Sequence, residues 1–411
     1  MKNLIATILL ALPLCSLAQN NNAPSSYDPH EIHISGYFQT QFQKASAPGI
    51  SSFSAGDFSK NSDNRFLIRR GRLKVDRADK YTSIVFQIDA TQNGFLLMDG
   101  FIQIHEPATR RWMLTAGLFN RPFGHSIAYS SGYRDFPERA RVFQTLMPRE
   151  RDLGAMVTYK PQTLLKFLTA NLGVVNGSGL TARDYDNKKD LIGNLAFKFD
   201  SLAGKKLDLG FGVSGYKGYV RNGTNTYFTR QGGGYIANTS ADFNGLYLRR
   251  DYVGADLQLS YRSPIGETIF KTEYVTGYQP GIANSEEVNG PASSQSFSAQ
   301  PKTDLYLRKF DGYFFWLSHQ IVNTKLSALL AYDVYDPNKD LANQEIGQTG
   351  NFTTAGDIKY STLGYGLTYL IGERIKFTLY NEHVVNENTA LENYTSDVRD
   401  DVFTARLQYR W

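Results

Sequence analysis

The chain ends in the stretch RDDVFTARLQYRW, residues 399–411. Alternate positions of this stretch hold apolar residues, namely Phe403, Ala405, Leu407, Tyr409 and Trp411. Successive side chains of a β-strand point to opposite faces, so this segment would have one apolar face and one mostly polar face. Lipid leaves no backbone group unpaired except in helices and closed sheets. The stretch therefore predicts the closing strand of a transmembrane β-barrel, with Trp411 on the lipid-facing side as the terminus that directs membrane insertion.

The same alternation recurs along the chain and is clearest in 81–90, 206–216 and 323–334. A period of two over about ten residues is the signature of a transmembrane strand. The pattern predicts about sixteen strands, at 31–43, 65–76, 81–91, 96–106, 111–119, 153–160, 165–175, 190–199, 206–216, 250–262, 267–279, 309–320, 323–334, 358–370, 374–384 and 399–411.

The connections between these segments alternate between long and short. The short ones are tight turns such as 77–80 and 371–373, and only 92–95 breaks the rhythm. Long outer loops, short periplasmic turns and an even strand number are typical of outer-membrane barrels, whereas a soluble sandwich has no reason to keep its long loops at one end. The long, polar connections are 44–64, 120–152, 176–189, 217–249, 280–308, 335–357 and 385–398.

The composition fits an all-β, up-and-down antiparallel barrel in the bacterial outer membrane. The 411 residues include 26 Tyr, 26 Phe and 36 Gly, and the mean hydropathy of −0.37 is too polar for a helical membrane protein. After the first twenty residues, no apolar run reaches the roughly 18 residues that a spanning helix needs. Residues 1–18 have the features of a removed signal peptide, with a cut before Gln19. Cys15 raises the alternative of a lipoprotein signal, but Pro13 and Leu14 stand where that signal wants small residues.

Residues 19–411 are then expected to form a single barrel domain. Aromatic residues near the predicted strand ends indicate interfacial girdles, although strands favour aromatic residues in any case. These residues are Tyr37, Phe38, Trp112, Tyr159, Tyr261, Tyr278, Trp316, Tyr369 and Tyr380.

A barrel of about sixteen strands leaves an aqueous channel, so passive diffusion is the expected function. The formal charge is +5, and removal of Lys2 with the signal peptide leaves +4. Arginines concentrate in 65–77 and in 120–152, the third outer connection, which we expect to fold inward and narrow the pore. Pro122 and Gly124 suit a turn that starts this inward course, or an ordinary strand-ending turn.

Arginine suits an anion site because its guanidinium stays charged and offers a planar fork of donors. The sharper interpretation is an arginine-lined pore that selects small anions. The alternative is that these cations bind lipopolysaccharide phosphates, or pair with Asp135, Glu138, Glu150 and Asp152. The candidate pore-lining residues are Arg69, Arg70, Arg72, Lys74, Arg134, Arg139, Arg141, Arg149 and Arg151.

Four motifs resemble the phosphate-selective porin family: RFLIRRGRLKVDR at 65–77, FQIDATQNGFLLMDGFIQIHE at 86–106, GLFNRPFG at 117–124 and ERARVFQTLMPRERDLG at 138–154. The motif-level likeness covers about 31–160, roughly a third of the chain. It implies a sixteen-stranded barrel, usually a homotrimer, that passes phosphate or related anions through an arginine-lined pore. Arg69, Arg70, Arg72, Arg139, Arg141, Arg149 and Arg151 fall in the matching motifs.

Two other functions remain open, and two more are argued against by the sequence. The open ones are a general, non-selective diffusion porin and an adhesin or structural barrel that would use the long, polar loops, although such a barrel would not need the arginines beside the third connection. A barrel enzyme would need a histidine beside Ser or Asp; His105 and His319 are assigned to lumen-facing positions, but no catalytic motif surrounds them. A barrel for hydrophobic solutes should have an apolar lumen face, which the alternation does not indicate. No motif indicates a cofactor, a metal site or nucleic-acid binding.

Overall fold

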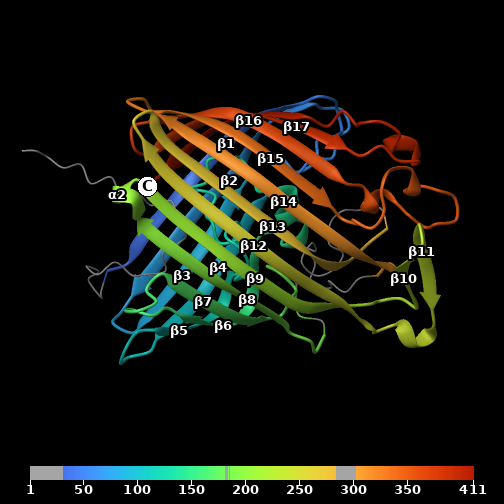
Figure 1. Cartoon of the computed structure of the whole chain (residues 1–411), viewed down its shortest axis with the longest axis horizontal. Helices are drawn as coiled ribbons and strands as arrows, with labels where there is room; N and C mark the ends of the chain where they lie inside the picture. Colours follow the sequence, from blue (N-terminus) through green and yellow to red (C-terminus); the bar gives the residue numbers. More distant parts are fainter. Residues whose placement is uncertain (1–30, 181–183, 185, 284–301) are drawn as a thin grey trace, which may run out of the picture.

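The computed structural model describes residues 31–180, 184, 186–283 and 302–411, so the predicted signal peptide lies outside the described residues. Sixteen strands form one closed antiparallel barrel (Figure 1). Each strand pairs with its neighbour in the chain, and β1 closes the ring by pairing with both β2 and β18. The wall consists of β1 (His33–Ala45), β2 (Asn64–Ala78), β3 (Thr82–Thr91), β4 (Gly94–His105), β5 (Trp112–Asn120), β6 (Arg151–Tyr159), β7 (Leu168–Val175), β8 (Asp190–Ser201), β9 (Leu207–Arg221), β12 (Tyr247–Ser263), β13 (Gly266–Gly281), β14 (Leu305–Ile321), β15 (Leu326–Asp336), β16 (Tyr360–Ile371), β17 (Ile375–Asn386) and β18 (Val402–Arg410).

All sixteen predicted strands are confirmed, with ends that differ by a few residues. The sequence reading missed a hairpin, β10 (Thr226–Gln231) and β11 (Gly234–Thr239), within the connection 217–249. The Gly-Gly pair at 232–233 between them is a turn signal that could have revealed it. The hairpin projects beyond the wall at the outer end (Figure 1).

The helices among the described residues are short: α1 (Arg141–Leu146), α2 (Leu202–Lys205), and the 3-10 turns η1 (Ala241–Phe243), η2 (Asn343–Glu345), η3 (Ala355–Asp357) and η4 (Glu392–Tyr394). None of these helices has the length and apolar character needed to cross a membrane. The secondary structure that positions the interior of the molecule is therefore almost entirely sheet.

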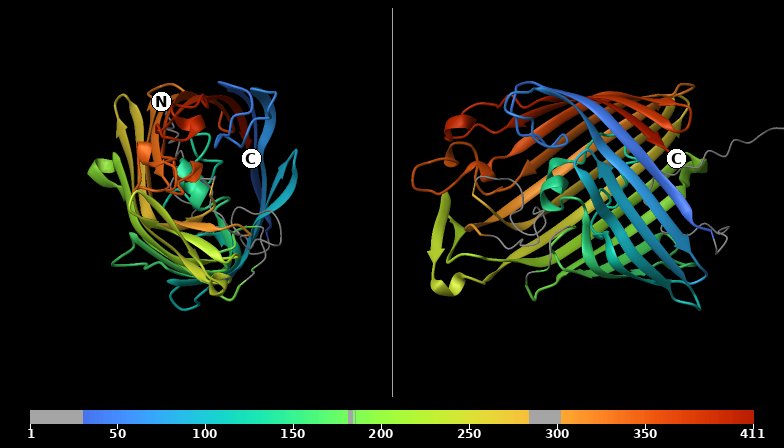
Figure 2. Two further views of the ribbon diagram at one scale, coloured as in Figure 1. Left: turned by 90° about the vertical axis from the view of Figure 1, so that its right-hand side faces the viewer. Right: turned by 180° about the vertical axis from the view of Figure 1, so that it is seen from behind.

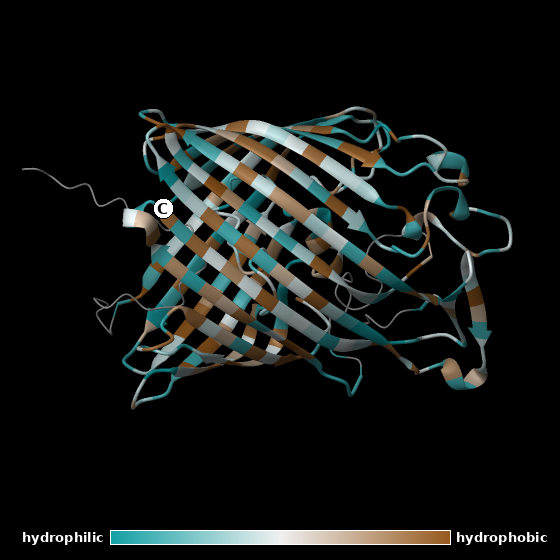
Figure 3. Ribbon diagram, in the orientation of Figure 1, coloured by the Kyte–Doolittle hydropathy of each residue, from teal (hydrophilic) through white to brown (hydrophobic). Residues whose placement is uncertain are grey.

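The two faces of the wall differ as the alternation predicts. In β18, Phe403, Leu407 and Tyr409 are exposed on the outer surface, whereas Arg406 and Gln408 are buried inside. Apolar and polar residues alternate in the same way along most strands (Figure 3). The outward apolar side chains form the band that a bilayer covers, because burying each such side chain away from water is favourable by about 1.5–3 kcal/mol.

The end of the chain closes the barrel at Gly36 of β1. Trp411 exchanges two backbone hydrogen bonds with Gly36, at 3.1 and 3.3 Å. The Trp411 ring lies over the same glycine, so closely that a Cβ there would be 2.6 Å from a ring carbon. The ring itself remains 44% exposed. The last residue therefore extends the β1–β18 pairing by one step and packs its ring on the outside.

At β3 and β4 the barrel wall extends less far outward than at the neighbouring β2. The outer connection between them is a two-residue turn, whereas β2 continues outward past the end of β3. Pairing of β2 with β3 begins at Arg72, so 64–71 pair only with β1. Phe66 and Phe95 on this rim are each 82% exposed. The barrel therefore has a notch in its outer half at β2–β4.

Replacing Gly36 by alanine should impair closure, because the new methyl group would collide with the Trp411 ring and with the backbone of β2. Overpacking of this kind costs about 1–3 kcal/mol. We expect a lower midpoint of unfolding in urea and less of the compact, heat-sensitive form on a gel. Gly215→Ala is the matched control, since its Cβ would meet nothing within 4 Å on another outward-facing strand position. Equal stability of the two variants would contradict the packing role of Trp411.

Candidate functional site

The third outer connection, 121–150, runs inside the barrel, and α1 lies within the ring of strands in the end view (Figure 2). At its start, Gly124 adopts a positive φ of 59° and lies against Glu273 of β13. A Cβ at Gly124 would be 1.6 Å from the Glu273 carboxylate. The backbone N–H of Ser126 donates to the same carboxylate at 3.0 Å. Only glycine allows the loop to turn down against the wall at this point.

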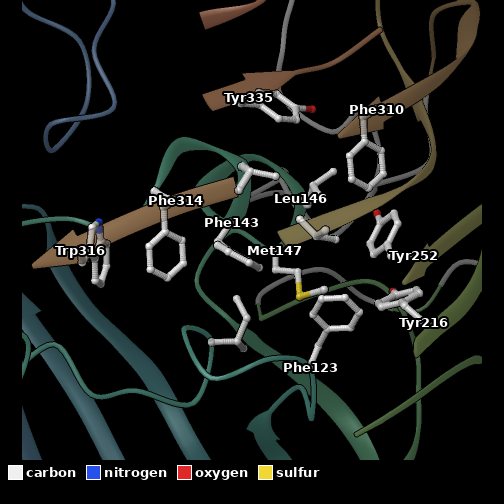
Figure 4. Packing of buried hydrophobic residues seen from close by; sticks show 14 of the residues in the cluster. Phe123, Phe143, Leu146, Met147, Tyr216, Tyr252, Phe310, Phe314, Trp316 and Tyr335 are labelled. Carbon is white, nitrogen blue, oxygen red and sulfur yellow. The ribbon is translucent and has the colours of Figure 1, made fainter. Parts of the chain in front are cut away.

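A hydrophobic cluster attaches this inward loop to the inner face of the wall (Figure 4). Phe143 of α1 meets Phe314 of β14 edge to face, with ring centroids 6.1 Å apart, and Phe136 stacks on Trp316 at 4.9 Å. Contacts of this kind fix a loop as firmly as a domain core. The cluster joins Phe123, Ile127, Phe136, Val142, Phe143, Leu146 and Met147 of the loop to Tyr216, Tyr252, Val275, Phe310, Phe314, Trp316, Leu329, Tyr335 and Tyr380 of the wall.

This cluster corrects two expectations. Tyr37, Trp316 and Tyr380, expected in the interfacial girdles, are buried inside the barrel, where Phe136 contacts both Trp316 and Tyr380. The lumen face is also not polar throughout, because β14 presents Phe310 and its apolar neighbours inward. The inward loop covers that apolar surface and keeps it from water.

Glu138 of the inward loop binds three arginines. Arg69 makes a two-pronged contact with both carboxylate oxygens at 2.8 Å, and Arg70 and Arg406 each donate at 2.7 Å. Arg69 and Arg70 both reach inward because a β-bulge interrupts the pairing of β2 with β1. Gln39 pairs with Arg70 and the next residue of β1 pairs with Ile68, so Arg69 is an extra residue in β2. Although burial opposes it, the three positive charges hold the pKa of Glu138 well below its ordinary value.

Glu150, at the end of the same loop, binds two more arginines. Its carboxylate pairs with Arg139 and, at 2.7 Å, with Arg151. Arg151 also donates two hydrogen bonds, of 3.0 and 3.1 Å, to the carboxylate of Asp99 in β4. Burial opposes the ionised form, but the arginine charges lower the pKa of Glu150 to about 2.

Arg72 and Lys74 of β2 have carboxylate partners on the wall itself. Arg72 pairs with Asp89 at 2.9 Å, and Lys74 with Asp76 at 3.2 Å. Both cations therefore carry a neighbouring negative charge. Among the candidate residues of this strand, neither presents an isolated positive charge to the lumen.

Arg134 and Arg141 are buried in the inward loop. Arg134 donates to two backbone carbonyl groups of its own loop at 3.1 and 3.2 Å. The guanidinium of Arg141 lies over the Tyr360 ring, 3.8 Å from its centroid. These two residues contribute to the attachment of the loop, and both are only 3–6% exposed.

Arg149 is the exposed member of the candidate set. It and Glu150 adopt consecutive left-handed backbone conformations, with φ of 60° and 65°, so their side chains diverge. Arg149 lines a cavity of about 720 Å³ between the loop and the rim of β2–β4. Among the described residues, it makes no hydrogen bond or ion pair with another side chain, and Asp89 and Glu150 are the nearest acids to influence it.

Sequence reasoning missed partners that lie far away in the chain. Arg406 was assigned to the polar face of the C-terminal strand, but its contact with Glu138 spans 268 positions. Arg121 pairs with Asp152 at 2.9 Å, and both are fully buried. The inward-facing Arg406 on β18 is a signal for a counter-charge inside the barrel, but nothing local in the sequence identifies Glu138 as that charge.

The alternation predicts that His105 and His319 face the lumen. His105 shares the inward phase of β4 with buried Gln103. His319 lies on the outward phase of β14 beside exposed Leu317 and shares a 2.9 Å hydrogen bond with Thr268, so that assignment was wrong. The error arose because β14 is apolar on both faces and its phase cannot be read from the alternation.

The loop contacts should survive mild acid. The pKa of Glu138 is lowered well below its ordinary value and that of Glu150 to about 2, so their ion pairs are fully formed above the ordinary carboxylate pKa and are lost only as the pH falls well below it. We expect hydrogen–deuterium exchange of 136–152, corrected for intrinsic rates, to stay constant from pH 7 to 5 and to rise sharply below pH 3. Glu150→Gln should raise exchange already at pH 7, because breaking a buried pair costs about 3–5 kcal/mol. Loosening of the wild-type loop between pH 7 and 5 would contradict this arrangement.

No protein-family model and no curated protein sequence matches the chain. Solved structures do match along nearly its whole length. The anion-selective porin from Comamonas acidovorans has a TM-score of 0.56 at 13% identity, over 93% of this chain and 99% of that one. The outer-membrane channel DcaP of Acinetobacter baumannii has a TM-score of 0.54 at 10% identity, over 93% and 97%.

OmpF of Salmonella typhi is similar as well, with a TM-score of 0.51 at 12% identity, over 92% of this chain and 97% of that one. At such identities the likeness concerns the fold. The predicted resemblance to the phosphate-selective family is matched only at the level of the porin fold. The chain therefore has the fold of a closed, sixteen-stranded, porin-type β-barrel, with a band of apolar side chains on its outer surface.

Proposed function

We propose that the protein is an outer-membrane channel for passive diffusion of small solutes, with a preference for anions such as phosphate and related oxyanions. The observation that carries this proposal is the 720 Å³ cavity beside the inward loop. Its lining contains six arginines and four carboxylates, which leaves a net charge of +2. The six arginines are Arg65, Arg69, Arg70, Arg72, Arg139 and Arg149, and the carboxylates are Asp57, Asp89, Glu138 and Glu150.

Arg149 is the residue best placed to meet a passing anion. Its guanidinium is exposed to the cavity and carries donors that no described side chain uses. A planar fork of donors suits the oxygens of phosphate or a carboxylate. Walls of low dielectric strengthen the field of an unpaired charge inside a narrow passage. Arg149 would therefore attract anions without a deep binding site that slows their exit.

The same contacts limit how strongly the channel can select. Glu138 neutralises part of the charge on Arg69, Arg70 and Arg406, and Glu150 does so for Arg139 and Arg151. Pairing with loop carboxylates, the alternative interpretation of the arginine cluster, thus applies to four of the nine candidate residues, namely Arg69, Arg70, Arg139 and Arg151. A weak, general preference for anions follows. Non-selective diffusion is the second candidate function, and this neutralisation is the observation that favours it.

The channel is proposed to assemble as a homotrimer. The notch at β2–β4 supports this, because Phe66 and Phe95 present large apolar surfaces on a rim where β2 pairs with β1 but no longer with β3. A second copy would cover those rings. Trp411, exposed on the outer face at the closing strand, is the proposed terminus for membrane insertion, and residues 1–18 are the proposed signal peptide.

The preference for anions is tested by Arg149→Gln and Arg149→Glu in planar lipid bilayers under a tenfold KCl gradient. One unit charge about 10 Å from an ion in water changes the ion's energy by about 0.4 kcal/mol, which is about twofold in permeability. We expect the wild type to favour chloride, the glutamine variant to lose about half of that preference, and the glutamate variant to approach neutrality. Arg77→Gln, on the opposite rim, is the matched control and should match the wild type.

Each outcome separates the candidate functions. Chloride preference that falls with Arg149 supports the proposal, and a lower chloride current in millimolar phosphate would extend it to phosphate. Equal permeability of chloride and potassium in the wild type would favour non-selective diffusion. Preference for potassium, or an unchanged reversal potential in both Arg149 variants, would overturn the role given to the cavity.

A further inference from the structure

A second cavity, of about 560 Å³, lies on the outside of the barrel wall. Its floor consists of the outer ends of β12, β13 and β14, which contribute Arg249, Tyr278 and Lys309. Its far side is the turn of the β10–β11 hairpin with Arg230, together with Asp340 from the connection 337–359. The hairpin reaches this position because β10 runs parallel to the first residues of β14.

The cavity opens toward the lipid-facing surface. Tyr278 lies opposite Asp251 and Lys309 in the sheet, and all three belong to the outward phase of their strands. One step nearer the middle of the barrel, the same phase carries Val253, which is 67% exposed, opposite Thr276. One step further in, it carries Ala255 opposite Tyr274, which is 42% exposed. The apolar band therefore ends within two steps of the cavity. This is the level at which lipid headgroups lie.

Arg249 holds its charge in place without a counter-ion. Its guanidinium stacks on the Tyr278 ring, 3.4 Å from the centroid, and the side chain is exposed. Among the described residues, it donates no hydrogen bond to another group. Stacking on an aromatic face orients the guanidinium and leaves its edge donors available for a ligand.

The cavity carries a net positive charge. Arg230, Arg249 and Lys309 face a single carboxylate, Asp340, which is 3.8 Å from Arg230 and 3.6 Å from Lys309. Arg230 is held by the backbone, since it donates to the carbonyl of Asp340 at 2.6 Å and to that of Gly232 at 3.0 Å. Two acids of the described wall flank the cavity: Asp251, opposite Tyr278, and Asp311, which pairs with Lys339 at 3.7 Å.

We propose that this cavity binds the phosphate group of an outer-leaflet glycolipid, the lipid A part of lipopolysaccharide. The three cations supply the charge, the Arg249 edge supplies paired donors for phosphate oxygens, and the apolar surface below accommodates the acyl chains. A diffusing solute would gain nothing from that surface, since the cavity lies outside the barrel. The hairpin β10–β11 is thus a clamp for a bound lipid, separate from the channel.

The proposal is tested with the purified, detergent-folded barrel and bisphosphorylated lipid A, by native mass spectrometry. We expect Arg249→Ala combined with Lys309→Ala to lower the fraction of lipid-bound protein at least tenfold. Arg249→Lys, which keeps the charge but loses the fork, should give an intermediate value. Lys325→Ala removes an exposed charge at the opposite end of the wall and should bind like the wild type. A heat-sensitive gel shift verifies that each variant is folded.

Two further binding measurements identify the ligand. Lipid A lacking both phosphates should bind the wild type as weakly as the double variant binds the intact lipid, and inorganic phosphate should not compete at millimolar concentration. Equal binding by the wild type and the double variant would overturn the proposal, as would competition by inorganic phosphate. Bilayer conductance and reversal potential of the double variant should equal those of the wild type, so failure of the channel proposal would leave this result unaffected.

Discussion

An apolar patch on the inner face of a water-filled barrel has to be covered by protein, and this requirement shapes the interior. Strands β13 to β15 carry Val275, Phe310, Phe314 and Leu329 on that face. The third outer connection covers them with α1 and the residues around it. Because the cover is fixed by packing, it displaces the open part of the lumen toward the opposite wall. The position of the charged residues, the cavity and the passage all follow from that displacement.

Most buried arginines inside the barrel are paired with carboxylates. Burying a guanidinium without an acid is costly, so the loop that brings Arg139 and Arg141 inward also brings Glu138 and Glu150. These carboxylates join the loop to β2, β6 and β18, and at the same time cancel much of the field that an arginine-rich sequence would otherwise produce. A count of arginines therefore overstates the electrostatic attraction of such a channel. The charge that is left to attract anions is the small excess of positive charge that stays exposed to water.

The sequence predicts the wall far better than the interior. Alternation is local, with a period of two, and turn residues separate the strands, so all sixteen segments could be found without any long-range information. The contacts of Glu138 with Arg70 and Arg406 span 68 and 268 positions, and no local rule pairs them. The bulge beside Gln39 turns two consecutive arginines inward, which a strict alternation forbids. Inward Trp316 looks like a girdle residue because an aromatic side chain suits either face.

The inward loop covers part of the lumen lining and leaves the rest exposed to the passage. Substitutions have different consequences on these two surfaces. Across β4 to β8 the wall presents a ladder of small polar groups, in which Gln103 donates to Thr115 at 3.3 Å and Asn171 to Asn194 at 2.8 Å. Substitutions on this ladder alter the width and polarity of the passage but leave the loop's packing intact. Substitutions under the loop alter folding first. Permeability and stability are thus encoded by separate sets of residues even where they share strands β6 to β8, which also carry Met156, Val175 and Ile192 of the loop's cluster. A lineage can therefore acquire new solutes by changes at the ladder positions without weakening the packing.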